Sequence, residues 1–189
     1  MCGIVGFVNE ETIENKNKNI KAMMDRIIHR GPNSSGQYVD DSVALGFRRL
    51  SIIDIEAGNQ PMYSPDGNVV LIFNGEIYNF LGLKEKLEEK GHTFLTHSDT
   101  EVLLHAYLEY GEKVVDHLRG MFGFAVWDKR EKKLFIARDH FGIKPYYYTM
   151  IDGDFVFGSE VKSFLKYPKF KKEVNEKALK HYLVFRYNP

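Results

Sequence analysis

The chain begins Met1-Cys2-Gly3-Ile4-Val5-Gly6-Phe7-Val8-Asn9, a thiol followed at once by an apolar run. Residues 3–8 have the composition of a buried strand. Cys2 is the only cysteine, and removal of Met1 would give it both a thiol and a free α-amine. An α-amine, with an ordinary pKa of about 7.7–8.0, can accept the thiol proton near neutral pH. The stretch therefore predicts either an N-terminal nucleophile or a small side chain packed in a strand, and alone it does not decide between them.

Composition limits the classes of protein to consider. The 189 residues suit a single domain, and 43% of them are hydrophobic, enough for a sizeable core. Lysine plus arginine and aspartate plus glutamate number 26 each, so charge gives no reason to expect nucleic acid or an anionic membrane as partner. One cysteine excludes an internal disulfide, and neither a signal peptide nor an apolar run of about 18 residues is visible. We therefore expect a cytoplasmic protein.

Strand-like and helix-like segments are grouped along the chain. Runs rich in Val, Ile, Phe and Tyr predict strands at 3–8, 36–46, 68–73, 121–127, 133–138 and 154–158, with a hairpin connection at 127–134. Apolar spacing of three and four predicts helices at 18–28, 80–90, 99–109, 159–166 and 175–185. Turn signals separate the strands, as in Ser64-Pro65-Asp66-Gly67. The pattern predicts an α+β layered sandwich of antiparallel sheets covered by helices. The uncapped apolar end at Asn188-Pro189 predicts a piece of a longer protein.

Three polar segments are candidates for a site, and each has an ordinary structural explanation. Asn74-Gly75 ends an apolar run, where it offers two donors at a strand tip, but Asn-Gly is also a common hairpin turn. Arg48-Arg49 ends another strand, and one arginine could clamp a carboxylate or simply lie on the surface. Ser98-Asp99 reads as a helix cap, although Asp99 could equally pair with a substrate ammonium.

The sequence gives no indication of a metal site or a phosphate site. The seven histidines do not fall at metal-ligand spacing, and there is no second cysteine. Gly120-Met121-Phe122-Gly123 precedes a predicted strand rather than a helix, so it is not a phosphate loop. We expect neither a metal nor a nucleotide in this chain.

Several segments together point to a known family. Five of them occur in that family's order: Cys2-Gly3-Ile4-Val5-Gly6, Arg30-Gly31-Pro32, Arg49-Leu50-Ser51-Ile52, Asn74-Gly75-Glu76-Ile77-Tyr78-Asn79 and Ser98-Asp99-Thr100-Glu101. With these, the chain resembles the N-terminal-nucleophile (Ntn) glutaminase domains of class II glutamine amidotransferases. The asparagine synthetase branch is indicated by Asn-Gly-Glu-Ile-Tyr-Asn, by Arg138-Asp139-His140-Phe141-Gly142-Ile143-Lys144-Pro145 before Tyr147-Tyr148, and by Gly158-Ser159-Glu160-Val161-Lys162.

The resemblance implies a role for each matching residue. Cys2 would be the nucleophile, with its own α-amine as general base and later acid. The Asn74 side chain and the Gly75 N–H would form the oxyanion hole. Arg49 would hold the α-carboxylate of glutamine and Asp99 its α-ammonium. The pocket would be completed by Glu76 and by the backbone of residues 50–53, which includes Leu50 and Ile52.

The same resemblance implies a fold and a reaction. The fold would be a four-layer αββα sandwich of the Ntn-hydrolase type, and residues 1–189 would form one type-2 glutamine amidotransferase domain. It would hydrolyse the side-chain amide of L-glutamine to glutamate and ammonia through a γ-glutamyl thioester on Cys2. In the parent enzyme, a synthetase domain of the same polypeptide, which is missing after Pro189, would use ATP and Mg²⁺ to make asparagine from aspartate. The domain itself would need no cofactor, and a homodimer is left open.

Two alternatives stay open at this stage. The chain could serve another class II amidotransferase with an amino-sugar or nucleotide-precursor acceptor. It could also be a non-enzymatic glutamine-binding module in which Cys2 is a core residue.

Overall fold

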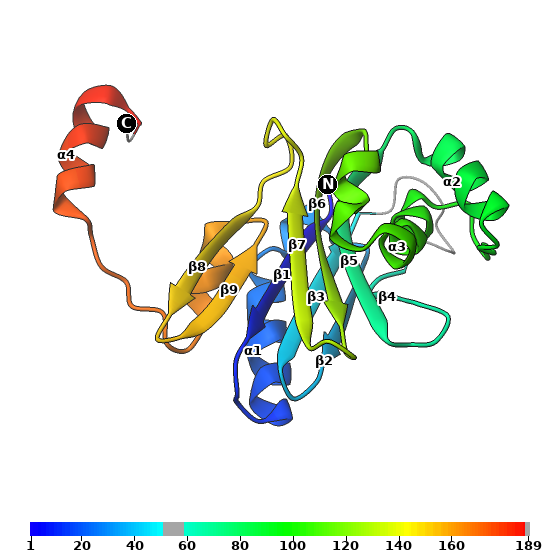
Figure 1. Ribbon diagram of the computed structural model, residues 1–189. Helices are drawn as coiled ribbons and strands as arrows, with labels where there is room; N and C mark the ends of the chain where they lie inside the picture. Colours follow the sequence, from blue (N-terminus) through cyan, green and yellow to red (C-terminus); the bar gives the residue numbers. More distant parts are fainter. Residues whose placement is uncertain (51–58, 188–189) are drawn as a thin grey trace.

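Two antiparallel sheets form the centre of the computed structural model, which describes residues 1–50 and 59–187 (Figure 1). The first sheet has the order β2-β3-β1-β9-β8 and the second the order β4-β5-β6-β7. The strands of the first sheet are β1 (Gly3–Val8), β2 (Ser34–Val39), β3 (Val43–Arg49), β8 (Tyr147–Ile151) and β9 (Asp154–Gly158). Those of the second are β4 (Met62–Tyr63), β5 (Val69–Ile77), β6 (Gly120–Asp128) and β7 (Lys133–Arg138).

Helices cover the outer face of each sheet. The α-helices are α1 (Ile13–Asp25), α2 (Phe80–Glu89), α3 (Asp99–Tyr110) and α4 (Glu176–Phe185), and the 3-10 helices are η1 (Ile28–Arg30), η2 (Gly111–His117) and η3 (Val161–Lys166). Helices α1 and η3 pack on the first sheet, around Phe7, Met23 and Phe164. Helices α2 and α3 pack on the second sheet, around Phe124 and Leu103. A third apolar cluster, which includes Ile4 and Ile72, fills the space between the sheets. The predicted α+β fold with four αββα layers is confirmed.

Several predicted boundaries were wrong for local reasons. The strand predicted at 36–46 is two strands, because the Asp40 carboxylate accepts hydrogen bonds from the N–H groups of Ser42 and Val43 and closes a turn. The helix predicted at 18–28 begins at Ile13 behind the N-cap Thr12 and ends at Asp25. The segment predicted as helix 159–166 is the 3-10 helix η3, and strands β4 and β8 were not predicted.

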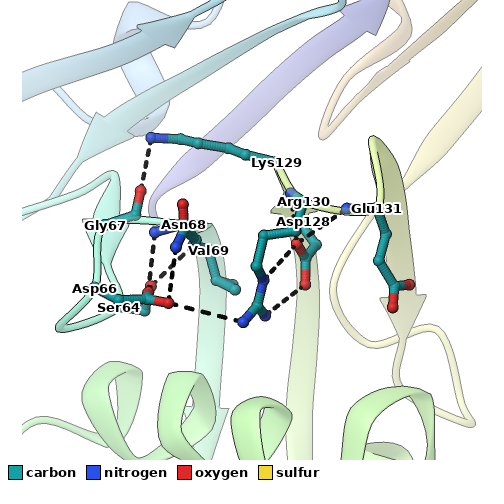
Figure 2. A network of polar contacts seen from close by, with 9 residues as sticks. All are labelled: Ser64, Asp66, Gly67, Asn68, Val69, Asp128, Lys129, Arg130 and Glu131. Atoms are coloured by element: carbon teal, nitrogen blue, oxygen red, sulfur yellow. Dashed lines mark hydrogen bonds and ion pairs between the residues drawn. The ribbon is translucent and has the colours of Figure 1, made fainter.

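The turn predicted at 64–67 is stabilised by its own side chains and by the neighbouring β6–β7 hairpin (Figure 2). The Asp66 carboxylate accepts hydrogen bonds from Ser64 Oγ at 2.5 Å and from Asn68 N at 3.0 Å, and these bonds hold its pKa far below the usual range. Lys129 Nζ donates to Gly67 O at 2.7 Å, and Arg130 Nη1 lies 3.7 Å from Asp66 Oδ2. These contacts join the connection before β5 to the hairpin after β6. They lie at the edge of the sheet where β5 begins and β6 ends, which is the edge away from Asn74.

Helix α4 lies apart from both sheets (Figure 1), and none of its residues is buried. Its apolar side chains Leu179, Tyr182, Leu183 and Phe185 are all exposed. Within the described part of the chain, no helix is both long and apolar enough to span a membrane.

We expect two glycines to respond oppositely to alanine substitution. In β1, a Cβ on Gly6 would lie 2.3 Å from the Phe157 ring, which fills the layer between the sheets, so Gly6→Ala should destabilise the fold by about 1–3 kcal/mol. In α2, a Cβ on Gly82 would meet nothing within 4 Å, so Gly82→Ala should stabilise it by about 0.5–1 kcal/mol. Urea unfolding measures both, and equal effects of the two substitutions would contradict the packing described here.

Candidate active site

A cavity of about 620 Å³ opens at the start of β1 and at the ends of β3 and β5. Of the residues predicted from the sequence to form a site, seven line it: Cys2, Arg49, Leu50, Asn74, Gly75, Glu76 and Asp99. Ile52 lies outside the described residues. These side chains come from both sheets and from α3, so the layered fold gathers in one place residues that are far apart in the sequence. Their catalytic roles stay predictions.

Cys2 is held at the cavity by backbone contacts on two sides. It precedes β1, whose first residue Gly3 pairs with Arg48 of β3. The Leu50 N–H points at Cys2 Sγ at 3.5 Å, and Arg30 Nε donates to Cys2 O at 3.0 Å. The thiol is partly buried.

Arg30 is itself fixed by a cluster of charges. Its Nη1 donates to Glu160 Oε1 at 3.1 Å, and the same carboxylate contacts His29 Nε2 at 2.8 Å and Lys162 Nζ at 2.9 Å. Burial alone would raise the pKa of Glu160, but the hydrogen bonds from Lys162, His29 and Arg30 lower it to about 2. Glu160 therefore stays charged at neutral pH and anchors the arginine that contacts Cys2.

The turn that follows Arg30 packs against the end of β3. A Cβ on Gly31 would lie 2.3 Å from the carbonyl carbon of Arg48, so only glycine allows this approach. Pro32 bridges to Arg49, and Asn33 N donates to Arg49 O at 3.1 Å. The Arg-Gly-Pro segment thus helps to fix the backbone of Arg49.

Arg48 and Arg49 point to opposite faces of β3, as successive residues of a strand must. Arg48 Nε donates to Met24 O at 3.2 Å, and its guanidinium pairs with Asp25 at the end of α1. Arg49 is only 5% exposed, lines the cavity, and donates from Nη1 to Asn59 Oδ1 at 3.3 Å. Of the two, Arg49 is the one placed to reach a ligand in the cavity.

The prediction that a strand ends at Asn74-Gly75 was wrong. Strand β5 continues to Ile77, and Asn74 pairs with Gly123 of β6. A Cβ on Gly75 would lie 2.3 Å from Met121 O, so a side chain there would push β6 away. The Asn74 side chain is buried, and its Nδ2 has no hydrogen-bond partner among the described residues. A buried amide donor of this kind is uncommon and is free for a ligand oxygen.

Asp99 is the first residue of α3, but Ser98 is the cap. Ser98 Oγ accepts from Glu101 N at 3.3 Å, while Asp99 Oδ2 accepts from Ile77 N at 2.9 Å and ties α3 to the end of β5. Burial raises the pKa of Asp99 to about 6, and repulsion from Glu76 acts in the same direction. A carboxyl in this state would gain from a cationic ligand in the cavity.

Two residues near the cavity received no role from the sequence. Arg30 belongs to a segment that served only to recognise the resemblance, and its contact with Cys2 O depends on the tertiary fold. Lys144 lines the cavity with a side chain that is 5% exposed. Its position after β7 gave no signal beyond the Arg138–Pro145 motif. Among the described residues there is no group of three or more His, Cys, Asp or Glu side chains arranged to hold a metal.

Comparisons with known proteins agree on one family. The family described as "Glutamine amidotransferase domain" matches residues 1–189. Asparagine synthetase [glutamine-hydrolyzing] 1 of Bacillus subtilis (strain 168) is 48% identical over 192 residues, covering 100% of this chain and 30% of that protein. Asparagine synthetase [glutamine-hydrolyzing] of Zea mays is 44% identical over 165 residues, covering 86% of this chain and 28% of that protein. The chain thus spans about 30% of the length of these relatives.

Solved structures show the same fold at low identity. Glutamine phosphoribosylpyrophosphate amidotransferase from B. subtilis, complexed with ADP and GMP, matches with a TM-score of 0.71 and 22% identity, over 86% of this chain and 43% of that one. A structure described as the allosteric regulatory enzyme of purine biosynthesis matches with a TM-score of 0.66 and 23% identity, over 87% and 43% of the two chains. With the Ntn amidotransferase fold and a family match along its whole length, the chain belongs to the glutamine amidotransferase domain family.

Proposed function

We propose that this chain hydrolyses the side-chain amide of L-glutamine to glutamate and ammonia through a γ-glutamyl thioester on Cys2. The observation that carries the proposal is the buried Asn74 Nδ2, which has no partner among the described residues and whose residue lines the same cavity as the only thiol of the chain. An oxyanion that forms during attack on an amide needs such a donor. A core cysteine in a binding module would not need one.

The reaction begins once Met1 is removed and Cys2 carries a free α-amine. The amine takes the thiol proton, and Sγ attacks the side-chain amide carbon of glutamine. The oxygen that becomes negative accepts hydrogen bonds from Asn74 Nδ2 and the Gly75 N–H. The protonated amine then gives its proton to the leaving nitrogen, and ammonia departs. Water, deprotonated by the same amine, attacks the thioester and releases glutamate while the thiol recovers its proton.

The charged ends of glutamine are recognised by Arg49 and Asp99. The Arg49 guanidinium holds the α-carboxylate, and the Asp99 carboxylate holds the α-ammonium. Glu76, Leu50 and Ile52 complete the pocket in this proposal. It is supported by the position of Arg49, Asp99, Glu76 and Leu50 around one cavity and by the raised pKa of Asp99.

The use of the released ammonia concerns the longer parent protein, and it is part of the same proposal. Relatives that are 48% and 44% identical are glutamine-hydrolysing asparagine synthetases, whereas the 22% likeness to a glutamine phosphoribosylpyrophosphate amidotransferase shows the fold alone. We therefore assign residues 1–189 to the glutaminase domain of such an enzyme. Its synthetase domain would use ATP and Mg²⁺ to make asparagine from aspartate, in the cytoplasm, while the glutaminase domain works without a cofactor.

Cys2→Ala should abolish glutamate release from glutamine and leave the thermal midpoint of unfolding close to wild type, because alanine fills the position of a small side chain. Glutamate and asparagine are assayed with and without ATP and aspartate. The wild-type chain should release glutamate without ATP and make no asparagine. Glutaminase activity in Cys2→Ala would overturn the nucleophile assignment, and strict ATP dependence would overturn the division between domains.

Arg49→Ala should raise KM for glutamine strongly, by an amount that corresponds to roughly 2–5 kcal/mol, because it leaves the substrate carboxylate unpaired in a buried pocket. Arg48→Ala is the matched control, since Arg48 faces Met24 and Asp25 and should change KM little. Steady-state kinetics of both variants decide the point. A larger rise in KM for Arg48→Ala would show that the wrong neighbour was chosen.

Asp99→Asn should make the ligand-free protein more stable at pH 8 and equally stable at pH 4. The folded-state pKa of about 6 lies above the ordinary value of 3.8, so the charged carboxyl costs stability that appears as pH rises from about 4 to 6. The cost is at most about 2–3 kcal/mol, and an amide at position 99 removes it. Urea unfolding at the two pH values measures the difference.

The same substitution should weaken glutamine binding at neutral pH, because the partner of the α-ammonium loses its charge. In the wild type, KM should rise as pH falls below about 6 and Asp99 becomes protonated. If Asp99→Asn is more stable but its KM is unchanged, the buried charge of Asp99 does not serve to bind the substrate ammonium.

A further inference from the structure

Lys144 carries a buried charge with an unusual partner. Its side chain is 5% exposed and lines the cavity that contains Cys2. Its Nζ contacts Met1 Sδ at 3.5 Å, and a thioether is a weak, neutral acceptor. Among the described residues, the ion pairs near the cavity involve Arg30, His29 and Lys162 with Glu160, and Lys144 joins none of them. Buried lysines are normally paired, so this charge calls for an explanation.

The backbone of Lys144 is fixed firmly. The Asp139 carboxylate accepts hydrogen bonds from Phe122 N at 3.2 Å, Ile143 N at 2.8 Å and Lys144 N at 3.0 Å. From the other side, Arg138 Nε donates to Lys144 O at 2.6 Å. Asp139 is thereby engaged with backbone groups. The turn after β7 therefore holds Lys144 in place at the cavity.

Other charged groups line the cavity from the elements packed around it. Arg49 at the end of β3 adds positive charge, while Glu76 of β5 and Asp99 of α3 are the acids, and His97 precedes α3. Neither acid forms an ion pair with Lys144 within the described ranges, and Asp99 Oδ2 accepts from Ile77 N. In the part of the chain that the structure describes, no carboxylate is thus in direct contact with the Lys144 ammonium.

Met1 is bonded directly to Cys2, and Lys144 Nζ touches the Met1 side chain. Removal of Met1 leaves the ammonium facing the space beside the new N-terminus. We propose that Lys144 holds the Cys2 α-amine in its unprotonated form, an inference that rests on the proposed function. A fixed positive charge disfavours a second one nearby and favours a thiolate. An unperturbed α-amine is mostly protonated at pH 7 and would be a poor base. Lys144 acts on the reaction only through Cys2.

The test compares the pH dependence of kcat/KM for glutamine in Lys144→Met, Lys144→Arg and Lys86→Met. Methionine keeps the length of the stem without the charge, arginine keeps the charge, and Lys86 is an exposed lysine of α2 outside the site. Lys144→Met should shift the acidic limb upward by about one pH unit and approach wild-type rates at high pH. The limb should stay in place in Lys144→Arg and Lys86→Met.

A second measurement needs no substitution. Because Cys2 is the only cysteine, labelling with ¹⁵N-cysteine gives a single α-amine signal whose titration reports its pKa. We expect a pKa below 7, about one unit under the ordinary value. An ordinary or raised pKa would overturn the inference. So would an unmoved acidic limb in folded Lys144→Met, or a rise in KM at every pH, which would make Lys144 a substrate-binding residue. The proposed function would survive these results as long as wild type is active and Cys2→Ala is not.

Discussion

The amide of Asn74 and the thiol of Cys2 line one cavity because two sheets face each other, and the rest of the site depends on that arrangement. Cys2 precedes β1 of one sheet, and Asn74 lies in β5 of the other, paired with Gly123. An unpaired buried donor costs about 1–3 kcal/mol. The three apolar clusters of the four layers stabilise the fold enough to keep this donor buried at the cavity. Strand pairing, rather than a loop, sets the position of both groups.

The other contacts around the cavity keep a backbone or a charge in place. Arg30, anchored by Glu160, contacts Cys2 O, and the glycine after it packs on the end of β3. Asp99 ties α3 to the end of β5 while its carboxyl is partly buried. In the proposed reaction, a site held in this way would need little reorganisation when charge develops on the substrate oxygen. The unpaired donor of Asn74 and the buried carboxyl of Asp99 both lower the stability of the ligand-free protein, as expected of a site arranged for a ligand.

Much of the fold could be predicted from the sequence, since alternating apolar runs and helical spacing are local signals. The turn at Asp40 was missed because one carboxylate, not a glycine or proline, divides β2 from β3. Asn74-Gly75 was misjudged as a strand end, because pairing with β6 overrides a turn preference and Gly75 serves close packing against Met121 O. Which face of β3 carries the Arg49 side chain depends on the register of the strand, and the contact between Lys144 and Met1 depends on the tertiary fold. Neither feature can be predicted from a local sequence pattern.

The central claim is that the unpaired Asn74 amide serves the transition state, and the kinetics of Asn74→Ala test it most directly. The account predicts that kcat for glutamine hydrolysis falls by about 10²–10³ while KM stays near the wild-type value, because the hydrogen bond forms mainly when the oxyanion does. The thermal midpoint should not fall, since the lost donor has no partner among the described residues. An unchanged kcat with a large rise in KM would contradict the account and make Asn74 a ground-state contact.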